Sequence, residues 1–218
     1  MAAVTDPSPA PAPRRRRTAG LALAGIAVAA IAAAAVAIAR PSAPPAELPD
    51  YGELAAFELT DQTGAPFGTR ELAGAPWIAN FIFTRCPTVC PVFTYKMARV
   101  QDATRAVGDR LRLVSFSVDP DYDTPEVLRA YADRHGADPS RWRFLTGAPD
   151  AVRTTVRDGL KMAMERAGDA GDVPNILHGT HFVLVDGRSH IRGYYDSNDA
   201  GAVDRLIRDA TALARDAR

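Results

Sequence analysis

The sequence is poor in cysteine, with only two in 218 residues, and it contains no internal repeat and no excess of charge of either sign. Five of its 26 basic residues but only one of its 26 acidic residues lie in residues 1–40, so the remainder carries a net charge of −4. A protein that binds nucleic acid through its phosphates needs a basic surface. The charge balance therefore argues against a nucleic-acid partner.

Hydrophobic residues are concentrated near the N-terminus, in a run without a charged residue over residues 18–39. At about 1.5 Å rise per residue, a helix of this length crosses the roughly 30 Å hydrocarbon core of a membrane. Four arginines, Arg14 to Arg17, precede the run and only Arg40 closes it, so the positive-inside rule places residues 1–17 in the cytoplasm. We expect a transmembrane anchor, with the rest of the chain exported.

A cleaved signal peptide is the alternative to the anchor, because small residues end the apolar run. The run is, however, longer than the about 7–15 residues of a signal core. No cysteine lies near its end, which argues against a lipoprotein anchor. Residues 40–50 contain four prolines and predict a stiff linker. Residues 51–218 are long enough for one domain.

From residue 51 onward, apolar patterns and turn residues predict an α/β sandwich. Strands are expected where β-branched and aromatic residues cluster, and helices where apolar residues recur at helical spacing. Residues 161–176 lack such a pattern, and we expect a surface loop there. The expected strands are residues 57–60, 66–67, 77–83, 111–118, 142–146, 181–186 and 191–195, and the expected helices are residues 92–107, 124–135, 148–160 and 200–214.

The two cysteines, Cys86 and Cys90, stand where the expected strand 77–83 leads into the expected helix 92–107. Residues four apart lie one helical turn apart, so both sulfurs can face one bound atom. Such a pair can bind a soft metal ion, act as a redox relay or form a structural disulfide. A bridge that closes so short a loop removes little chain entropy, which disfavours the structural disulfide.

The position of the pair at a helix N-terminus has an electrostatic consequence. The first N–H groups of the helix and its positive end are expected to lower the pKa of a cysteine, which helps either metal binding or redox chemistry. In an oxidising compartment two nearby thiols form a disulfide unless a metal or a reductant holds them. The thiol pair of an exported domain therefore has to be maintained.

Three stretches of the sequence resemble the Sco/SenC family, and the likeness covers about residues 51–218. The first replaces the Cys-x-x-Cys of thioredoxins by Cys-x-x-x-Cys-Pro. The stretches are Cys86-Pro87-Thr88-Val89-Cys90-Pro91, Ser117-Val118-Asp119-Pro120-Asp121-Tyr122-Asp123-Thr124-Pro125 and His178-Gly179-Thr180-His181-Phe182-Val183-Leu184-Val185-Asp186.

The resemblance implies a thioredoxin-like fold and a single-pass protein of the bacterial cytoplasmic membrane, with its C-terminal domain on the extracytoplasmic side. It implies copper as the bound metal and the copper-bearing subunit of cytochrome c oxidase as the partner. The implied metal ligands are Cys86, Cys90 and His178. His181 is the alternative third ligand, since residues three apart in an extended segment point to opposite faces and only one can face the cysteines.

Two thiolates and one imidazole suit Cu(I), and the imidazole also lets the site hold Cu(II). Zinc would normally take a fourth ligand or keep a water molecule in that place, and the sequence offers no obvious fourth residue. Asp119 and Asp123 follow the next expected strand, where they can either shape the site as outer groups or serve as ordinary turn and cap residues. Arg85 is expected to be solvated.

The remaining candidates for a special role are not expected to bind metal. Met97, at helical spacing behind the cysteines, is expected in the core, and we expect no copper ligand among Met97, Met162 and Met164. His135 is expected to end a helix, where it complements the dipole. His190 is expected in a turn without an evident partner.

Two functions remain open from the sequence. The first is a copper chaperone, not an enzyme, that passes copper from Cys86, Cys90 and His178 to the oxidase. The second is a thiol:disulfide oxidoreductase that reduces the copper-site cysteines of the oxidase subunit, with Cys86 attacking and Cys90 resolving. A peroxidase of the peroxiredoxin kind would need a Thr-x-x-Cys nucleophile, a spacing that Thr84 does not supply.

Overall fold

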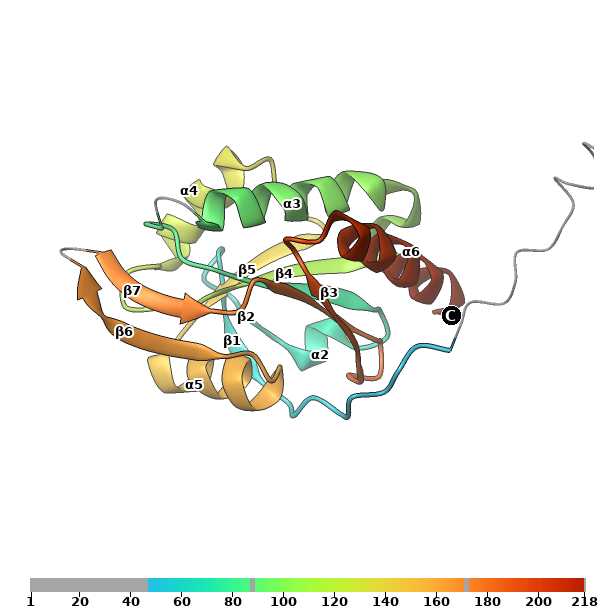
Figure 1. Ribbon diagram of the computed structural model, residues 1–218, viewed down its shortest axis with the longest axis horizontal. Coiled ribbons are helices and arrows are strands. Elements are labelled where there is room, and N and C mark those ends of the chain that lie inside the picture. Colours follow the sequence, from blue (N-terminus) through green and yellow to red (C-terminus); the bar gives the residue numbers. More distant parts are fainter. Residues whose placement is uncertain (1–46, 87–88, 171–172, 218) are drawn as a thin grey trace, which may run out of the picture. The chain divides into compact units, whose positions relative to one another are not determined.

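A mixed seven-stranded sheet, in the order β2-β1-β5-β4-β3-β8-β9, forms the centre of the computed structural model (Figure 1). The structure describes residues 47–86, 89–170 and 173–217. The three central strands β3, β4 and β5 run parallel, and the strands on either side of them pair antiparallel. The strands are β1 (Glu58–Asp61), β2 (Pro66–Gly68), β3 (Trp77–Ile82), β4 (Arg112–Ser117), β5 (Trp142–Thr146), β8 (His181–Val185) and β9 (Ile191–Asp196).

Helices cover both faces of this sheet, with α3, α4 and α6 on one face and α2 and α5 on the other (Figure 1). The predicted α/β sandwich is therefore confirmed. The helices are α2 (Thr69–Leu72), α3 (Val89–Ala103), α4 (Pro125–Arg134), α5 (Pro149–Arg153) and α6 (Ala200–Asp216); the 3₁₀ segment η1 (Arg105–Arg110) follows α3, and the π-helical turn η2 (Thr154–Gly159) continues α5.

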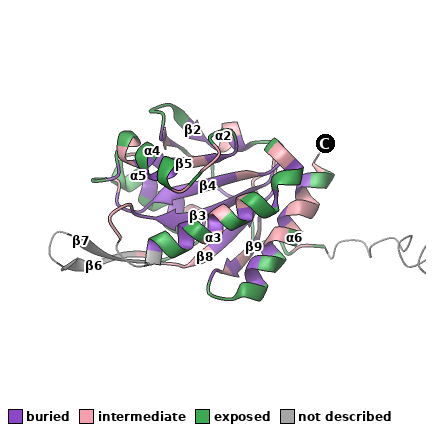
Figure 2. Cartoon of the chain, turned by 90° about the horizontal axis from the view of Figure 1, so that it is seen from above, coloured by how far each residue is buried: buried purple, intermediate pink, exposed green. Residues whose placement is uncertain are grey.

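The core lies between the sheet and these helices, and Figure 2 shows its central strands as buried. All six residues of β3 are buried and all but Asn80 are apolar, which explains why apolar and polar residues do not alternate in this segment. Met97 is fully buried, as predicted, and Trp77 at the start of β3 is buried as well. Because β3 is buried on both faces, the position of its C-terminal end is fixed. The cysteine loop follows directly from that end.

Most predicted elements are confirmed, but their ends shift where local chemistry allows it. Helix α3 begins at Val89, three residues earlier than predicted, because Pro91 is tolerated in a first helical turn. Helix α4 begins as predicted, with the Thr124 side chain accepting from the Val127 amide. In α6 the buried face consists of Val203 and Leu206 together with the small residues Ala202, Ala210 and Ala214.

The loop predicted over residues 161–176 is wrong, because the chain forms a separate antiparallel hairpin there. Strands β6 (Met164–Ala170) and β7 (Val173–His178) pair with each other outside the main sheet. Their register shifts between Arg166 and Asp169. Because of its glycines, its proline and this register shift, the segment does not alternate between apolar and polar residues as a regular strand does. The backbone hydrogen bonds of the hairpin do not require such an alternation.

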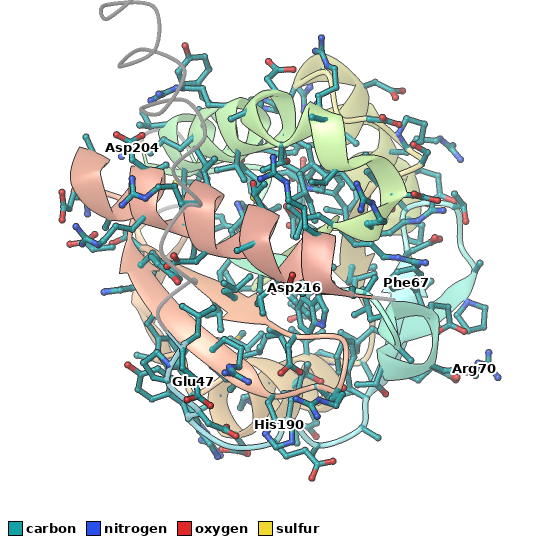
Figure 3. The ribbon with its side chains drawn as sticks, turned by 90° about the vertical axis from the view of Figure 1, so that its right-hand side faces the viewer. Glu47, Phe67, Arg70, His190, Asp204 and Asp216 are labelled. Atoms are coloured by element: carbon teal, nitrogen blue, oxygen red, sulfur yellow. The ribbon has the colours of Figure 1, made fainter. Side chains whose placement is uncertain are left out.

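The two ends of the sheet carry different features. At the left of Figure 1 lie the C-terminal ends of β3 and β4 and the β6–β7 hairpin. The opposite end faces the viewer in Figure 3, where Glu47, His190 and Asp216 are labelled. There His190 Nδ1 lies 2.8 Å from Asp50 Oδ2, so this turn histidine has a partner that the sequence did not suggest.

The predicted anchor, residues 18–39, lies outside the described residues and stays a prediction. Among the helices that the structure describes, none combines the length and the apolar character needed to span a bilayer. The predicted tail, residues 1–17, and most of the linker, residues 40–50, are likewise not described.

Candidate metal centre

The two cysteines are brought together at the C-terminal end of β3. The chain turns after Phe83, whose carbonyl accepts from the Cys86 amide at 3.2 Å, and Cys90 follows in the first turn of α3. The Cys90 amide donates to Cys86 Sγ at 3.5 Å. Both are in the thiol form, Cys86 half-buried and Cys90 fully buried. The Cys86 sulfur therefore lies beside the Cys90 backbone, and the prediction that both sulfurs face one bound atom stays a prediction.

The predicted lowering of thiol pKa is wrong for Cys90. Burial raises the pKa of the Cys90 thiol well above its usual range, and this outweighs the backbone hydrogen bond from Phe83 that lowers it. Tyr131 of α4 shares this apolar environment, and burial raises its pKa to about 12. Its hydroxyl lies 2.8 Å from Thr94 Oγ1 of α3. A buried thiol of this kind remains protonated until a metal ion displaces its proton.

Asp123 fastens the segment before the cysteines to the end of β4. The carboxylate is fully buried and accepts from the Thr84 amide at 3.2 Å, from Thr84 Oγ1 at 2.5 Å and from Ser117 Oγ at 2.6 Å. Burial raises the pKa of Asp123, although these hydrogen bonds act in the opposite direction. Asp123 therefore shapes the cysteine loop and does more than begin helix α4.

Arg85 makes a second connection between the cysteine loop and the end of β4. The prediction that this arginine is solvated is wrong. Its Nε donates to Asp119 Oδ2 at 2.8 Å, and Asp119 is almost fully buried. The guanidinium lies over the Tyr122 ring, 4.4 Å from its centroid. A carboxylate without a partner would be unfavourable at this depth, so Arg85 and Asp119 stabilise each other.

The predicted third ligand, His178, is the last residue of β7, and the structure describes its backbone position only. Strand β8 follows two residues later and pairs antiparallel with β3, with Ala79 opposite Val183. The start of β8 is therefore next to the end of β3, the end that leads to the cysteines. His181 begins β8 and is half-buried. The choice between His178 and His181 stays a prediction.

The methionines occupy three different environments. Met97 is fully buried in α3, and Met162 is nearly so. A Cβ atom on Gly179 would collide with the terminal methyl of Met162, so this methionine packs directly on the residue after His178. Met164 is only partly buried and lines a cavity of about 110 Å³ with Asp119 and neighbouring residues.

Sequence reasoning missed Thr84 and Ser117 as part of the site. Thr84 lies just before the cysteine motif, and Ser117 begins the motif that contains Asp123. Neither side chain is a typical metal ligand or nucleophile of such a site, so the sequence did not single it out. Their roles arise from hydrogen bonds to Asp123, which is 39 residues from Thr84. Only the parallel pairing of β3 with β4 brings these side chains together.

The donor set fits a soft metal ion. Two neighbouring thiols suit Cu(I). Within the described residues, no group of three or more histidine, cysteine, aspartate or glutamate side chains is arranged to hold a metal ion. The described part of the candidate centre therefore consists of Cys86 and Cys90, on a loop that hydrogen bonds connect to the end of β4.

Comparisons with known proteins agree on one family. The SCO1/SenC family model matches residues 47–215. A Stutzerimonas stutzeri protein, provisionally named as copper-binding, is 32% identical over 151 residues, 67% of this chain and 71% of that protein. The chain is also similar to the solved structure of a SCO1/SenC family lipoprotein from Bacillus anthracis, with a TM-score of 0.67 and 36% identity over 74% of this chain and 95% of that one.

A further solved structure is that of BsSco, described as containing a disulfide switch and as a member of the Sco family of cytochrome c oxidase assembly proteins. It has a TM-score of 0.67 and 28% identity, over 77% of this chain and 96% of that one. The matches cover the described domain, with its mixed sheet and its cysteine pair. The chain belongs to the SCO1/SenC family.

Proposed function

We propose that this protein binds one copper ion through Cys86, Cys90 and His178 and delivers it to the copper-bearing subunit of cytochrome c oxidase. Residues 18–39 anchor it in the cytoplasmic membrane, and residues 40–50 hold the domain near the membrane surface on the extracytoplasmic side. Copper is cargo in this role, so no bond in a substrate is made or broken.

The observation that carries the proposal is the placement of the two thiols. Cys90 donates its amide to Cys86 Sγ at 3.5 Å, and two buried carboxylates hold the loop that carries them. Thiolates are soft donors, and preorganised soft donors favour Cu(I). Cys86 is half-buried, which leaves one sulfur accessible to a partner that takes the metal.

The relatives support both parts of the proposal. One is named for copper binding, and BsSco is described as belonging to a family of cytochrome c oxidase assembly proteins. Both are similar to this chain over the domain that contains the cysteines. His178 completes the proposed ligand set because it stands at the junction of β7 and β8, beside the end of β3.

A second function, thiol:disulfide exchange with the oxidase subunit, is favoured by the disulfide switch described for BsSco. Here the accessible Cys86 thiolate would attack a partner disulfide, and Cys90 would then attack Cys86 and release the reduced partner. The partner gains two electrons and two protons, and the two thiols become one disulfide. The half-buried Cys86 and buried Cys90 suit the attacking and resolving roles respectively.

The test is a titration of Cu(I) and of Cu(II) into the reduced full chain, kept in detergent to accommodate residues 18–39. Cu(II) is followed by its thiolate charge-transfer absorption, and Cu(I) by competition with a coloured chelator. We expect one copper per chain, with binding much weaker in His178→Ala. The matched control is His181→Ala, three residues away, which should bind copper as the unsubstituted chain does.

The outcomes separate the candidate functions. Copper binding that is lost in His181→Ala but kept in His178→Ala would transfer the third ligand to His181. A reduced chain that binds no copper at submicromolar concentration, yet forms a readily reversible disulfide, would overturn copper delivery in favour of the thiol relay. The relay alone should also survive His178→Ala, because thiol exchange does not need an imidazole at this position.

A further inference from the structure

The turn that follows β9 holds the chain just before β8. The Ser197 amide donates to the Thr180 carbonyl at 3.0 Å, which extends the β8–β9 pairing by one residue, and Asn198 Nδ2 donates to Thr180 Oγ1 at 3.1 Å. Ser197 is almost fully buried. Thr180 is therefore bound through both its backbone and its side chain, although it lies between two strands and belongs to neither.

The same turn is bound to helix α3, which carries Cys90. Lys96 of α3 is half-buried, and its Nζ donates to the Ser197 carbonyl at 2.7 Å. A hydrogen bond from an ammonium group is stronger than one between neutral groups. The turn leads from β9 into α6, which lies on the same face of the sheet as α3 (Figure 1). Two hydrogen bonds of Ser197 thus connect α3 to the start of β8. We call Lys96, Thr180, Ser197 and Asn198 the turn bridge.

An aromatic contact joins the same two elements. The ring centroids of Phe93 in α3 and Phe182 in β8 are 4.7 Å apart, and both side chains are buried. Phe93 stands three residues before Lys96, and Phe182 two residues after Thr180. The hydrophobic effect is not directional, whereas hydrogen bonds depend on angle. The aromatic contact therefore holds α3 against β8, and the turn bridge orients the chain at Thr180.

Both candidates for the third copper ligand are attached to this held position. His178 precedes Thr180 by two residues, and His181 follows it directly. The β6–β7 hairpin, which ends at His178, pairs only with itself. Thr180 is therefore a point at which the chain is fastened as it returns to the main sheet, whichever of the two histidines binds the metal.

We propose that Lys96 and Asn198 are positioning residues for the third copper ligand, because the turn bridge places the chain around Thr180 relative to α3. This inference rests on the proposed function. Two thiolates alone suit Cu(I), whereas the imidazole is what lets the site hold Cu(II). Loss of the turn bridge should therefore weaken Cu(II) binding more than Cu(I) binding.

The main test is Lys96→Leu, which keeps an apolar side chain and removes the donor. Groups that support a metal site from outside its ligands change metal affinity by about 10–100-fold, so we expect Cu(II) binding by the reduced full chain in detergent to weaken on the order of tenfold. The charge-transfer band of bound Cu(II) should shift. Cu(I) affinity, measured by chelator competition, should change by less than about threefold. Asn198→Ala should act in the same direction.

Two further variants separate positioning from the loss of a charge. Lys96→Arg retains a cationic donor for the Ser197 carbonyl, so it should bind Cu(II) as the unsubstituted chain does. Arg99→Leu removes an exposed cation three residues further along α3 and should leave both copper affinities unchanged.

A readout without metal measures the turn bridge itself. The Ser197 amide, which donates to Thr180, should exchange its hydrogen roughly tenfold faster in Lys96→Leu than in the unsubstituted chain. Exchange in β3 should not change, because the core of the sheet is untouched. An unchanged rate at Ser197 would show that Lys96 does not hold the turn.

Three copper-binding results would overturn the assignment. An unchanged Cu(II) affinity and charge-transfer band in Lys96→Leu would remove the positioning role and leave the proposed function intact. An equal loss of Cu(II) affinity in Lys96→Leu and Arg99→Leu would assign the effect to the charge of α3 and not to the turn bridge. A reduced, unsubstituted chain that binds no copper would overturn the proposed function and the positioning role together.

Discussion

The cysteine loop and the β6–β7 hairpin supply the two halves of the candidate site, and they are built in different ways. The loop is fastened to the central sheet by Asp123 and by the Arg85–Asp119 pair, both at the buried end of β4. The hairpin pairs only with itself and does not join the seven-stranded sheet. The thiols are thus held before any metal arrives, whereas the proposed histidine ligand depends on a two-stranded element, which has little stability of its own.

This difference predicts the largest effect in hydrogen exchange. Without metal, amides of β6 and β7 should exchange at least about a thousandfold faster than amides of β3, since a lone hairpin opens without unfolding the core. One equivalent of copper should slow exchange in β7 and leave β3 unchanged. Exchange-coupled mass spectrometry measures both. Equal protection of the two regions without metal would contradict the comparison.

Removing the Asp123 carboxylate should have the next largest effect. Asp123→Ala leaves the Thr84 amide, the Thr84 hydroxyl and the Ser117 hydroxyl without their acceptor in a buried place. We expect a loss of about 2–4 kcal/mol in the free energy of unfolding, measured by urea denaturation. Asp133→Ala, which removes an exposed carboxylate of α4, is the control and should change stability by less than about 0.5 kcal/mol.

The Arg85–Asp119 pair should contribute less, because Arg85 is one-quarter exposed. Arg85→Ala leaves the buried Asp119 without its partner and should cost about 1–2 kcal/mol of unfolding free energy. The cysteine loop should also loosen, so Cys86 should react faster with a thiol reagent. Arg70→Ala, which removes an exposed ion pair of α2, is the control; an equal effect there would show that Arg85 has no special role.

The smallest effect is on the pH dependence of stability. The pKa of Asp123 is raised above its ordinary 3.8 in the folded chain, so the folded state retains a proton that the unfolded state has already released. Its contribution is fully present below pH 3.8 and is lost as the pH rises through the folded pKa.

Relative to Asp123→Asn, whose amide does not titrate, the unsubstituted chain should therefore lose stability as the pH rises from 3.8 through the folded pKa. Urea denaturation at a series of pH values measures the difference. Parallel stability curves for the two chains would show that the pKa of Asp123 is not shifted.

The sequence by itself determined the elements whose signals are local. The apolar, aromatic-rich run 77–83 specified a buried strand, and Thr124 with Pro125 specified the start of α4. The spacing of Cys86 and Cys90 already brought the two residues close together, and the Cys90 amide donates to Cys86 Sγ at 3.5 Å. Each of these features depends on residues a few positions apart, so no knowledge of the fold was needed.

Only the tertiary structure decided what surrounds those cysteines. Arg85 pairs with Asp119 across 34 residues and Thr84 with Asp123 across 39, because β3 and β4 run side by side. The same packing buries Cys90 and raises the pKa of its thiol against the expectation from the helix N-terminus. Hydrogen bonds and ion pairs between distant segments, and the burial that results from their packing, leave no periodic pattern in the sequence. They can therefore be recognised only once the sheet has brought the segments together.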